Sequence, residues 1–225
     1  MRALVVPGVV LLLAACGAAP PREAPAAKSE PAAAPRARAV NPDAPVLVAF
    51  GDSLTAGHGI GVEASYPTVL EAELAARGSE MLIVNEGVSG DTTSSALARI
   101  DVAVSHAPAW ALVALGANDG LRGLPVTETE ANLRRIVERF REAGAQVALA
   151  GMKLPPNYGP EYVKGFEAIY PRIAEELSVP LMPFLLEEVA AEPSLNLDDG
   201  IHPNEEGARI VARNVADFLV PLLNP

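Results

Sequence analysis

The sequence predicts an α/β fold, a three-layer α/β/α sandwich built on a five-stranded parallel sheet. Short runs of almost continuous apolar residues alternate along the chain with longer amphipathic stretches, and strands buried on both faces of a parallel sheet show such runs. The composition agrees, because 50% of the residues are hydrophobic and only 4% are aromatic. A core rich in Ala, Val and Leu is typical of helices packed on a sheet.

The predicted elements follow one another as strand and helix. The apolar runs are the candidate strands, at residues 46–50, 81–84, 110–115, 146–150 and around 179–184. The amphipathic stretches are the candidate helices, at roughly 67–77, 93–105, 127–143, 161–177 and 204–222. Thr127 followed by Glu130 is a candidate capping box for the third helix. Right-handed crossovers make the strands parallel, and five strands favour the flavodoxin-like order 2-1-3-4-5.

The N-terminal segment 1–15 is typical of a signal peptide, with one positive charge followed by an apolar run over residues 3–13. It is too short to remain as a membrane-spanning helix. The stretch "LAACG" at 13–17 is similar to a bacterial lipoprotein lipobox, which implies cleavage before Cys16 and lipidation of this residue. The alternative is an ordinary secretory peptide in which the cysteine has no role.

Residues 16–45 are rich in Ala and Pro, a composition that cannot bury enough apolar surface to fold. We expect a disordered tether here, followed by one folded domain at 46–225. The lipobox implies a membrane-anchored lipoprotein on the periplasmic side of a bacterial cell envelope. Because Gly17 rather than Asp follows the cysteine, sorting to the outer membrane is expected over the inner membrane.

Composition also restricts the partners. The net charge of −11 repels polyphosphates, so we expect no nucleic-acid partner. The single cysteine cannot form an intramolecular disulfide. No H-E-x-x-H motif or Cys/His ligand spacing occurs, so we expect neither a metal nor another cofactor. The expectation is a monomer that acts on a small molecule.

Four polar clusters mark the candidate site. "GDS" at 51–53, "NEGVSGDTTSS" at 85–95 and "LGANDGLRG" at 115–123 follow the first three strands, and "LDDGIHPNEEG" at 197–207 precedes the last helix. Each alone is also explained as a turn or a helix cap. Because the carboxyl ends of parallel strands meet at one edge of the sheet, the clusters together predict a functional site there.

The residue types in these clusters are those that acyl transfer needs. Serine is a weak nucleophile unless a base takes its proton, and histidine is a base near neutrality. Ser53 is the candidate nucleophile, His202 the base, and Asp199 the carboxylate that orients the ring. His58, in a glycine-rich loop, and His106, at a helix end, are expected to be surface residues.

The first three clusters supply candidate donors for the oxyanion of a tetrahedral intermediate. These are the backbone N–H groups of Ser53 and Gly90 and the side-chain amide of Asn118. Asp52 is expected to order the turn before Ser53 through hydrogen bonds, without taking part in proton transfer.

The chain resembles the SGNH or GDSL hydrolases over residues 46 to about 222. The motifs that carry the resemblance are "GDSL" at 51–54, Gly90, "GAND" at 116–119 and "DGIHP" at 199–203, in the family's order. The resemblance implies the SGNH hydrolase fold and a Ser-His-Asp acyl-enzyme mechanism. It also implies the same roles for the residues already singled out, namely Ser53, Asp199 and His202 as the triad and Ser53, Gly90 and Asn118 as the oxyanion hole.

Between these motifs, "LPPNYG" at 154–159 is similar to the thioesterase, protease and lysophospholipase branch of the family, which includes arylesterases. This branch implies hydrolysis of aryl esters, short to medium acyl esters or lysophospholipids, with thioesters left open. It also implies that Leu154, Pro155, Asn157 and Tyr158 border the substrate. Two alternatives remain: a carbohydrate O-acetylesterase, and a catalytically silent lipoprotein that binds acyl groups or glycans.

Overall fold

The computed structural model of the protein describes residues 43–224. The predicted signal peptide at 1–15, the lipidated Cys16 and all but the end of the tether at 16–45 lie outside the described residues. Among the helices of the described part, none has the length and hydropathy needed to cross a membrane.

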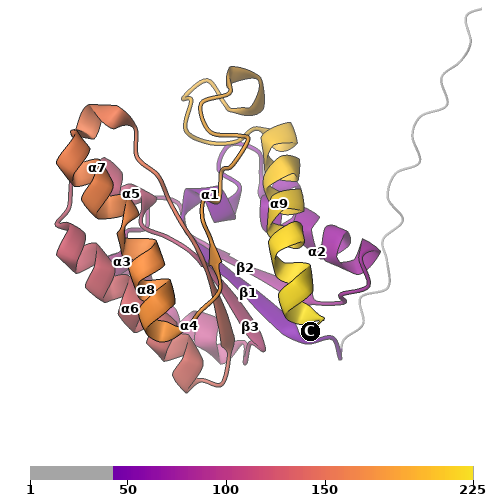
Figure 1. The fold of residues 1–225 in the computed structure, drawn as a ribbon. Helices are drawn as coiled ribbons and strands as arrows, with labels where there is room; N and C mark the ends of the chain where they lie inside the picture. The colour runs from indigo at the N-terminus through magenta and orange to yellow at the C-terminus, as the bar shows by residue number, and fades with distance from the viewer. Residues whose placement is uncertain (1–42, 225) are drawn as a thin grey trace, which may run out of the picture. The chain divides into compact units, whose positions relative to one another are not determined.

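A parallel five-stranded sheet forms the centre of the fold, in the order β2-β1-β3-β4-β5. Its strands are β1 (Val46–Gly51), β2 (Leu82–Gly87), β3 (Trp110–Ala114), β4 (Gln146–Ala150) and β5 (Leu181–Met182). Figure 1 shows helices on both faces of the sheet. The predicted sandwich and the predicted strand order 2-1-3-4-5 are therefore confirmed.

β4 has its predicted limits, β1 and β3 differ from theirs by one residue each, and β2 and β5 differ more. The fifth is only Leu181–Met182 rather than 179–184, because prolines at 180 and 183 lack the N–H that a longer ladder would need. The second extends to Gly87, so that Asn85 and Glu86 lie within the strand and not in the loop after it. As the strand at one end of the sheet, β2 is only half-buried along its whole length.

The helices are α1 (Ser53–Ala56), α2 (Tyr66–Ala76), α3 (Thr93–Ala98), α4 (Ile100–Ser105), α5 (Ala117–Leu121), α6 (Val126–Glu142), α7 (Pro160–Glu167), α8 (Ile169–Leu177) and α9 (Glu205–Leu223). Short 3₁₀ turns occupy η1 (Val62–Ala64), η2 (Pro156–Tyr158) and η3 (Pro193–Leu195). In Figure 1, α2 and α9 lie together on one face of the sheet, and α3, α4, α6 and α8 lie on the other.

Two of the predicted helices are each divided in two. The stretch 93–105 is divided at Arg99, whose side chain turns back to Asp91, with Nε 2.6 Å from Oδ2. The stretch 161–177 is divided at Ala168. The reason for the second break is a proline at position 171, which cannot donate to the carbonyl four residues earlier.

The predicted capping box of the third long helix is wrong. The helix begins at Val126, so that Thr127 already lies inside its first turn, and no side chain caps it. Glu130 is instead nearly buried and accepts hydrogen bonds from Arg134 at 3.1 Å and Arg172 at 2.7 Å. The acidic residue therefore joins α6 to α8 rather than closing the helix end.

The core lies on both faces of the central strands. Phe50 of β1 packs edge-on against Phe140 of α6, with ring centroids 5.3 Å apart. Leu70 of α2 and Val215 of α9 are fully buried in the layer on the other face. The strands that precede the site motifs are packed in this core. The loops after these strands are therefore held at fixed positions.

Candidate active site

Ser53 lies at the junction between β1 and a short helix. β1 ends at Gly51, and Asp52 is the N-cap of α1, where its Oδ1 accepts the N–H of Leu54 at 3.0 Å. Ser53 is thus the first helical residue, and N–H groups in the first helical turn have no partner within the helix. The prediction that Asp52 orders this turn is confirmed by the hydrogen bond.

Asp52 is also completely buried. Burial away from water raises the pKa of its carboxyl from 3.8 to about 7, against the lowering effects of the Leu54 N–H and of His202. A carboxyl directly before Ser53 therefore titrates near neutral pH.

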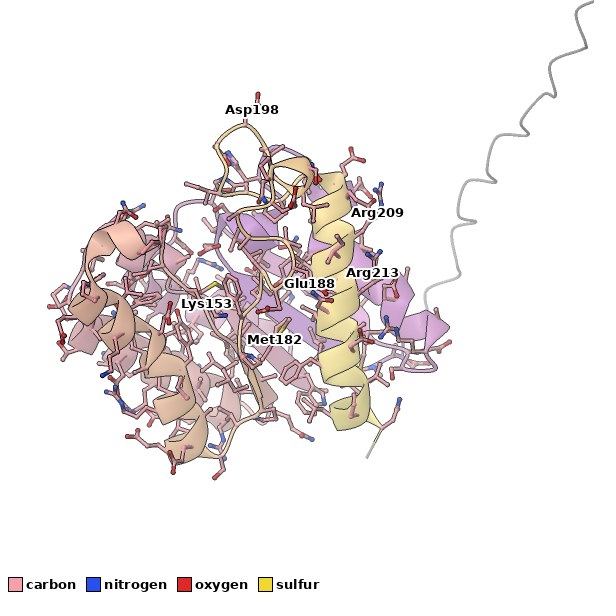
Figure 2. All side chains as sticks on the ribbon, turned by 45° about the horizontal axis from the view of Figure 1, so that its top comes forward. Lys153, Met182, Glu188, Asp198, Arg209 and Arg213 are labelled. Carbon is pink, nitrogen blue, oxygen red and sulfur yellow. The ribbon has the colours of Figure 1, made fainter. Side chains whose placement is uncertain are left out.

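Asp199 and His202 are held together by the turn that carries them. Asp199 Oδ1 accepts the backbone N–H groups of Ile201 at 2.9 Å and His202 at 3.0 Å. Its Oδ2 lies 2.7 Å from His202 Nδ1. These bonds, above all the backbone N–H of His202, lower the pKa of Asp199 to about 2, so that it stays ionised. The neighbouring Asp198 points out from the tip of the loop (Figure 2).

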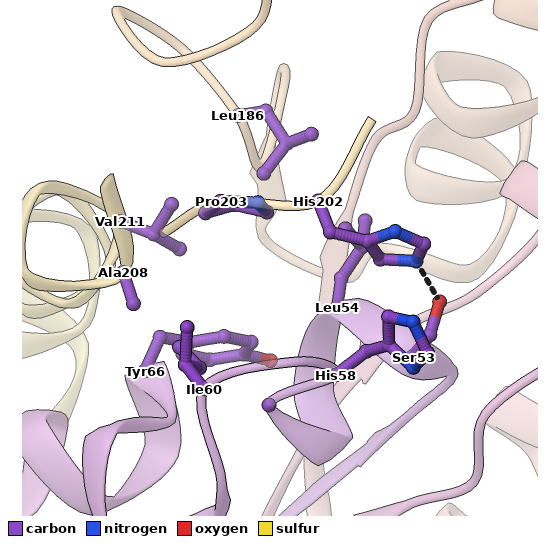
Figure 3. Close-up of a pocket in the computed structure, with 11 residues that line it drawn as sticks. Ser53, Leu54, His58, Ile60, Tyr66, Leu186, His202, Pro203, Ala208 and Val211 are labelled. Carbon is purple, nitrogen blue, oxygen red and sulfur yellow. Dashed lines mark hydrogen bonds between the residues drawn. The ribbon is translucent and has the colours of Figure 1, made fainter. Parts of the chain in front are cut away.

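The ring of His202 links this turn to the end of β1. Its Nε2 lies 2.8 Å from Ser53 Oγ (Figure 3). Because an ionised carboxylate only accepts hydrogen bonds, Asp199 fixes the proton on Nδ1, and Nε2 is left to accept the proton of Ser53. The structure thus brings the three predicted triad residues into one hydrogen-bonded chain.

The two other predicted oxyanion residues lie on the neighbouring loops. Gly90 has a φ of +86°, in the left-handed region that favours glycine, and its carbonyl accepts Arg122 Nη2 at 2.9 Å. Asn118, at the start of α5, donates from Nδ2 to the Asp91 carbonyl at 3.0 Å and more weakly to Asp52 Oδ2 at 3.4 Å. Its amide therefore lies beside the turn that carries Ser53.

Arg99, which the sequence analysis did not single out, joins the ends of two strands to the loop that carries Gly90. It donates to the carbonyls of Gly51 at 3.1 Å and Glu86 at 3.0 Å, in addition to its ion pair with Asp91. The ends of β1 and β2 and the loop before α3 are joined in this way. No motif marks Arg99 in the sequence, because its partners are brought to it only by the fold.

Asp119 has a similar role between α5 and α3. It is buried, and its carboxylate accepts the backbone N–H of Thr93 at 2.8 Å and the hydroxyl of the same residue at 2.5 Å. Asp119 thus has a structural role, because its hydrogen bonds fix the positions of the second and third polar clusters relative to each other.

A groove of about 540 Å³ opens beside Ser53 and His202, a volume within the range of small-molecule sites. Its walls are mainly apolar, with the larger side chains supplied by Leu54, Leu121, Met152, Phe184, Leu186 and Ile201. Asn118 also faces it. Phe184 and Leu186 come from the chain after β5, where the sequence analysis placed no site residue.

Of the four predicted substrate residues, two line the groove and two do not. Leu154 and Pro155 line the groove. Tyr158 does not line it and instead donates its hydroxyl to the Leu121 carbonyl at 2.9 Å, which supports the groove wall. Asn157 is exposed and away from the groove lining.

The two remaining histidines differ in their surroundings. His106 is exposed, with Nε2 2.7 Å from Glu86 Oε1. His58 is exposed as predicted, but its ring packs against that of His202, with centroids 4.5 Å apart (Figure 3). This contact was not predicted, because His58 follows a short helix and only the fold brings the last loop over it.

Comparisons with known proteins agree with this geometry. Residues 49–210 match the GDSL-like Lipase/Acylhydrolase family. The chain is 42% identical to the thioesterase 1/protease 1/lysophospholipase L1 of Escherichia coli (strain K12), over 80% of this chain and 86% of that protein. It is 41% identical to an arylesterase of Vibrio mimicus, over 77% of this chain and 88% of that protein.

Solved structures show the same fold. A crystal structure of TesA superposes with a TM-score of 0.75 at 36% identity, covering 79% of this chain and 99% of TesA. The psychrotrophic esterase EstA from Pseudoalteromonas sp. superposes with a TM-score of 0.76 at 33% identity, covering 80% of this chain and 99% of EstA. The protein described here therefore belongs to the GDSL-like lipase/acylhydrolase family and is an ester hydrolase of the SGNH type.

Proposed function

We propose that Ser53, His202 and Asp199 hydrolyse carboxylic esters of apolar acyl groups through an acyl-enzyme. The observation that carries this proposal is the chain of hydrogen bonds from Asp199 Oδ2 through the His202 ring to Ser53 Oγ, at 2.7 and 2.8 Å. It lies at the mouth of an apolar groove. The serine, its base and a place for the acyl group are thus adjacent.

In the acylation step, Ser53 Oγ attacks the ester carbonyl while its proton passes to His202 Nε2. Asp199 stabilises the imidazolium that forms, since its low pKa keeps it ionised. The tetrahedral intermediate collapses when the C–O bond to the alcohol breaks and His202 returns the proton to the leaving oxygen. In deacylation, water attacks the acyl carbonyl, His202 takes a proton from it, and Ser53 is released as the alcohol.

The negative oxygen of each intermediate is stabilised by the N–H groups of Ser53 and Gly90 and by the amide of Asn118. When the oxyanion forms, Asn118 donates one N–H to it in place of the long 3.4 Å contact to Asp52 Oδ2. Its stronger bond to the Asp91 carbonyl, at 3.0 Å, keeps the amide in place while the other N–H donates to the oxyanion.

The substrates we propose are aryl esters, short to medium acyl esters and lysophospholipids. The apolar lining of the groove supports esters of hydrocarbon acids over esters of acetate on a sugar, because apolar chains gain free energy on leaving water. The names of the thioesterase 1/protease 1/lysophospholipase L1 and of the arylesterase support the same substrates. Thioesters react by the same steps, with a thiol as the leaving group.

A hydrolysis screen tests this substrate class. It compares p-nitrophenyl esters of increasing acyl length with a lysophospholipid, an acyl thioester and acetylated sugars. We expect kcat/KM to rise from the acetyl ester to longer acyl esters. A preference for acetylated sugars would favour a carbohydrate O-acetylesterase, and absence of turnover with every substrate would favour a silent binding protein.

We also propose that the chain is a monomeric lipoprotein on the periplasmic side of a bacterial cell envelope, anchored through Cys16 in the outer membrane. The support comes from the sequence alone, from the signal-peptide pattern at 1–15 and the lipobox-like residues around Cys16. The Ala- and Pro-rich tether at 16–45 then gives the catalytic domain a distance from the membrane.

A further inference from the structure

His58 lies against the ring of the proposed catalytic base, yet the proposed reaction makes no use of it. It follows Gly57, which ends α1 with a φ of +79°. Its ring is 4.5 Å from that of His202 between centroids, with 43° between the ring planes. Figure 3 shows the His58 ring below that of His202 and next to Ser53. Among residues 43–224, no group forms a hydrogen bond with the His58 ring.

The two histidines and Asp199 form a set of metal-ligand atoms. One such atom from each of the three residues lies within 4.8 Å of those of the other two. Two imidazoles and a carboxylate are ligands that Zn²⁺ and similar divalent transition metals prefer. The set could not be seen as a sequence motif, because His58 is far from the other two residues along the chain.

The imidazole nitrogens of His58 and His202 must come closer together to bind one ion. Zinc binds imidazole nitrogen at about 2.0–2.1 Å, so two nitrogens on one tetrahedral zinc are about 3.4 Å apart. The ring of His58 is exposed and has no hydrogen-bond partner within residues 43–224, so rotation of the side chain brings its nitrogen closer without breaking a hydrogen bond there. Asp199 already orients the ring of His202 from Nδ1, as carboxylates do for zinc-bound histidines.

We propose that His58 and His202 bind a divalent transition-metal ion of the zinc class, His202 through Nε2 while Asp199 stays on its Nδ1, and that the bound ion inhibits ester hydrolysis. The ion takes the lone pair of His202 Nε2, to which Ser53 would otherwise transfer its proton. No covalent bond of the protein is broken and no electron is transferred. Because the ion removes the base and leaves the acyl groove open, it lowers kcat more than it raises KM.

The inhibition rests on the proposed role of His202 as base, so metal binding is measured separately from activity. Calorimetric titration with ZnCl₂ is carried out on the wild type, on Ser53→Ala and on His58→Gln. We expect Ser53→Ala to bind Zn²⁺, since both imidazoles remain. His58→Gln is expected to bind it at least ~10-fold more weakly, because a ligand is lost.

Hydrolysis of p-nitrophenyl butyrate is then measured with and without Zn²⁺, each protein being compared with its own metal-free rate. We expect Zn²⁺ to inhibit the wild type, EDTA to reverse the effect, and His58→Gln to need at least ~10-fold more Zn²⁺. His106→Gln is the matched control, since it removes an exposed histidine that is paired with Glu86. It is expected to be inhibited like the wild type.

The proposal is overturned if the wild type binds no Zn²⁺, or if His58→Gln binds it as tightly as the wild type does. Binding that depends on His58 but leaves hydrolysis unchanged would overturn the coordination of His202. The proposed esterase function is tested separately by the rate of the wild type without metal. If that rate is zero, the esterase proposal fails, whatever the result of the metal titration.

Discussion

His202 Nε2 lies 2.8 Å from Ser53 Oγ, although 149 positions separate the two residues in the sequence. Ser53 begins the helix after β1, and His202 comes from the loop before the last helix. The strand order places β1 between β2 and β3, at the point where the order of the strands reverses. In open α/β sheets, this is where ligands bind.

The first prediction concerns the triad as a unit. Ser53→Ala is expected to lower kcat by on the order of 10⁴ or more, and His202→Ala by a similar factor. Asp199→Ala is expected to cost less. The double variant of Ser53 and His202 should be no slower than either single variant, because the residues act in one proton transfer. Kinetics on a p-nitrophenyl ester, together with the melting temperature, measures this, and normal turnover by Ser53→Ala would disprove the assignment.

The second prediction separates a catalytic from a structural role of Asn118. If its amide stabilises the oxyanion, Asn118→Ala should lower kcat by roughly 10² to 10³ while KM changes little. Asn118→Asp should be at least as damaging, since it puts an acceptor and a negative charge beside the developing charge. The measurement is kcat, KM and melting temperature of both variants. Loss of stability with a normal kcat would show that Asn118 only supports the start of α5.

The third prediction follows from the buried Asp52. Its pKa is raised to about 7 in the folded protein from 3.8, so folding favours the protonated carboxyl. The stabilisation is complete below the unfolded pKa and is lost as the pH rises through about 7. Asp52→Asn carries no charge and keeps an acceptor for the Leu54 N–H. The variant is therefore expected to gain stability relative to the wild type as the pH rises.

Urea unfolding of both proteins near pH 5 and near pH 8 measures this difference, since other titrating groups are common to the two. The free energy of unfolding of Asp52→Asn minus that of the wild type should be larger near pH 8. An equal difference at the two pH values would mean that Asp52 does not titrate between them.

Much of the fold could be predicted because apolar runs of strand length alternate with amphipathic stretches. β4 has the limits that were predicted, and β1 and β3, which are buried almost throughout, differ from theirs by one residue each. The helix break at Ala168 and the short β5 could be explained by nearby prolines, but their exact limits depend on which backbone groups find partners. The mistaken capping box at Thr127 has another cause, since Glu130 pairs with Arg134 one turn further along α6 and with Arg172 of α8, which only the fold brings near.

The candidate site was predictable to the extent that its residues stand in motifs at strand ends. Ser53, Asn118 and His202 line one groove, as expected for such positions. Contacts made only by the fold were not predictable, above all the packing of His58 on His202 and the bonds of Arg99 to the ends of β1 and β2 and to Asp91. Burial of Asp52, which raises its pKa, also depends on the whole assembled core.

The fourth prediction concerns the N-terminus. We expect the full chain to incorporate labelled lipid at Cys16, the residue that follows the predicted signal peptide. The attached lipid chains should then make the protein partition with membranes. Cys16→Ser should be poorly processed and unlabelled. Metabolic lipid labelling with mass determination of the mature chain measures this. A mature, unlipidated N-terminus downstream of Cys16 would refute the lipoprotein assignment and leave the esterase assignment standing.

The central claim is that Ser53 forms the covalent bond to the acyl group, and mass spectrometry after phosphonylation tests it most directly. A p-nitrophenyl alkylphosphonate should react once per chain as activity is lost, with the added mass on the peptide that contains Ser53. His202→Ala should react far more slowly, because the base that takes the Ser53 proton is missing. Complete inhibition with the adduct on another residue, or equal labelling of Ser53→Ala, would contradict the account.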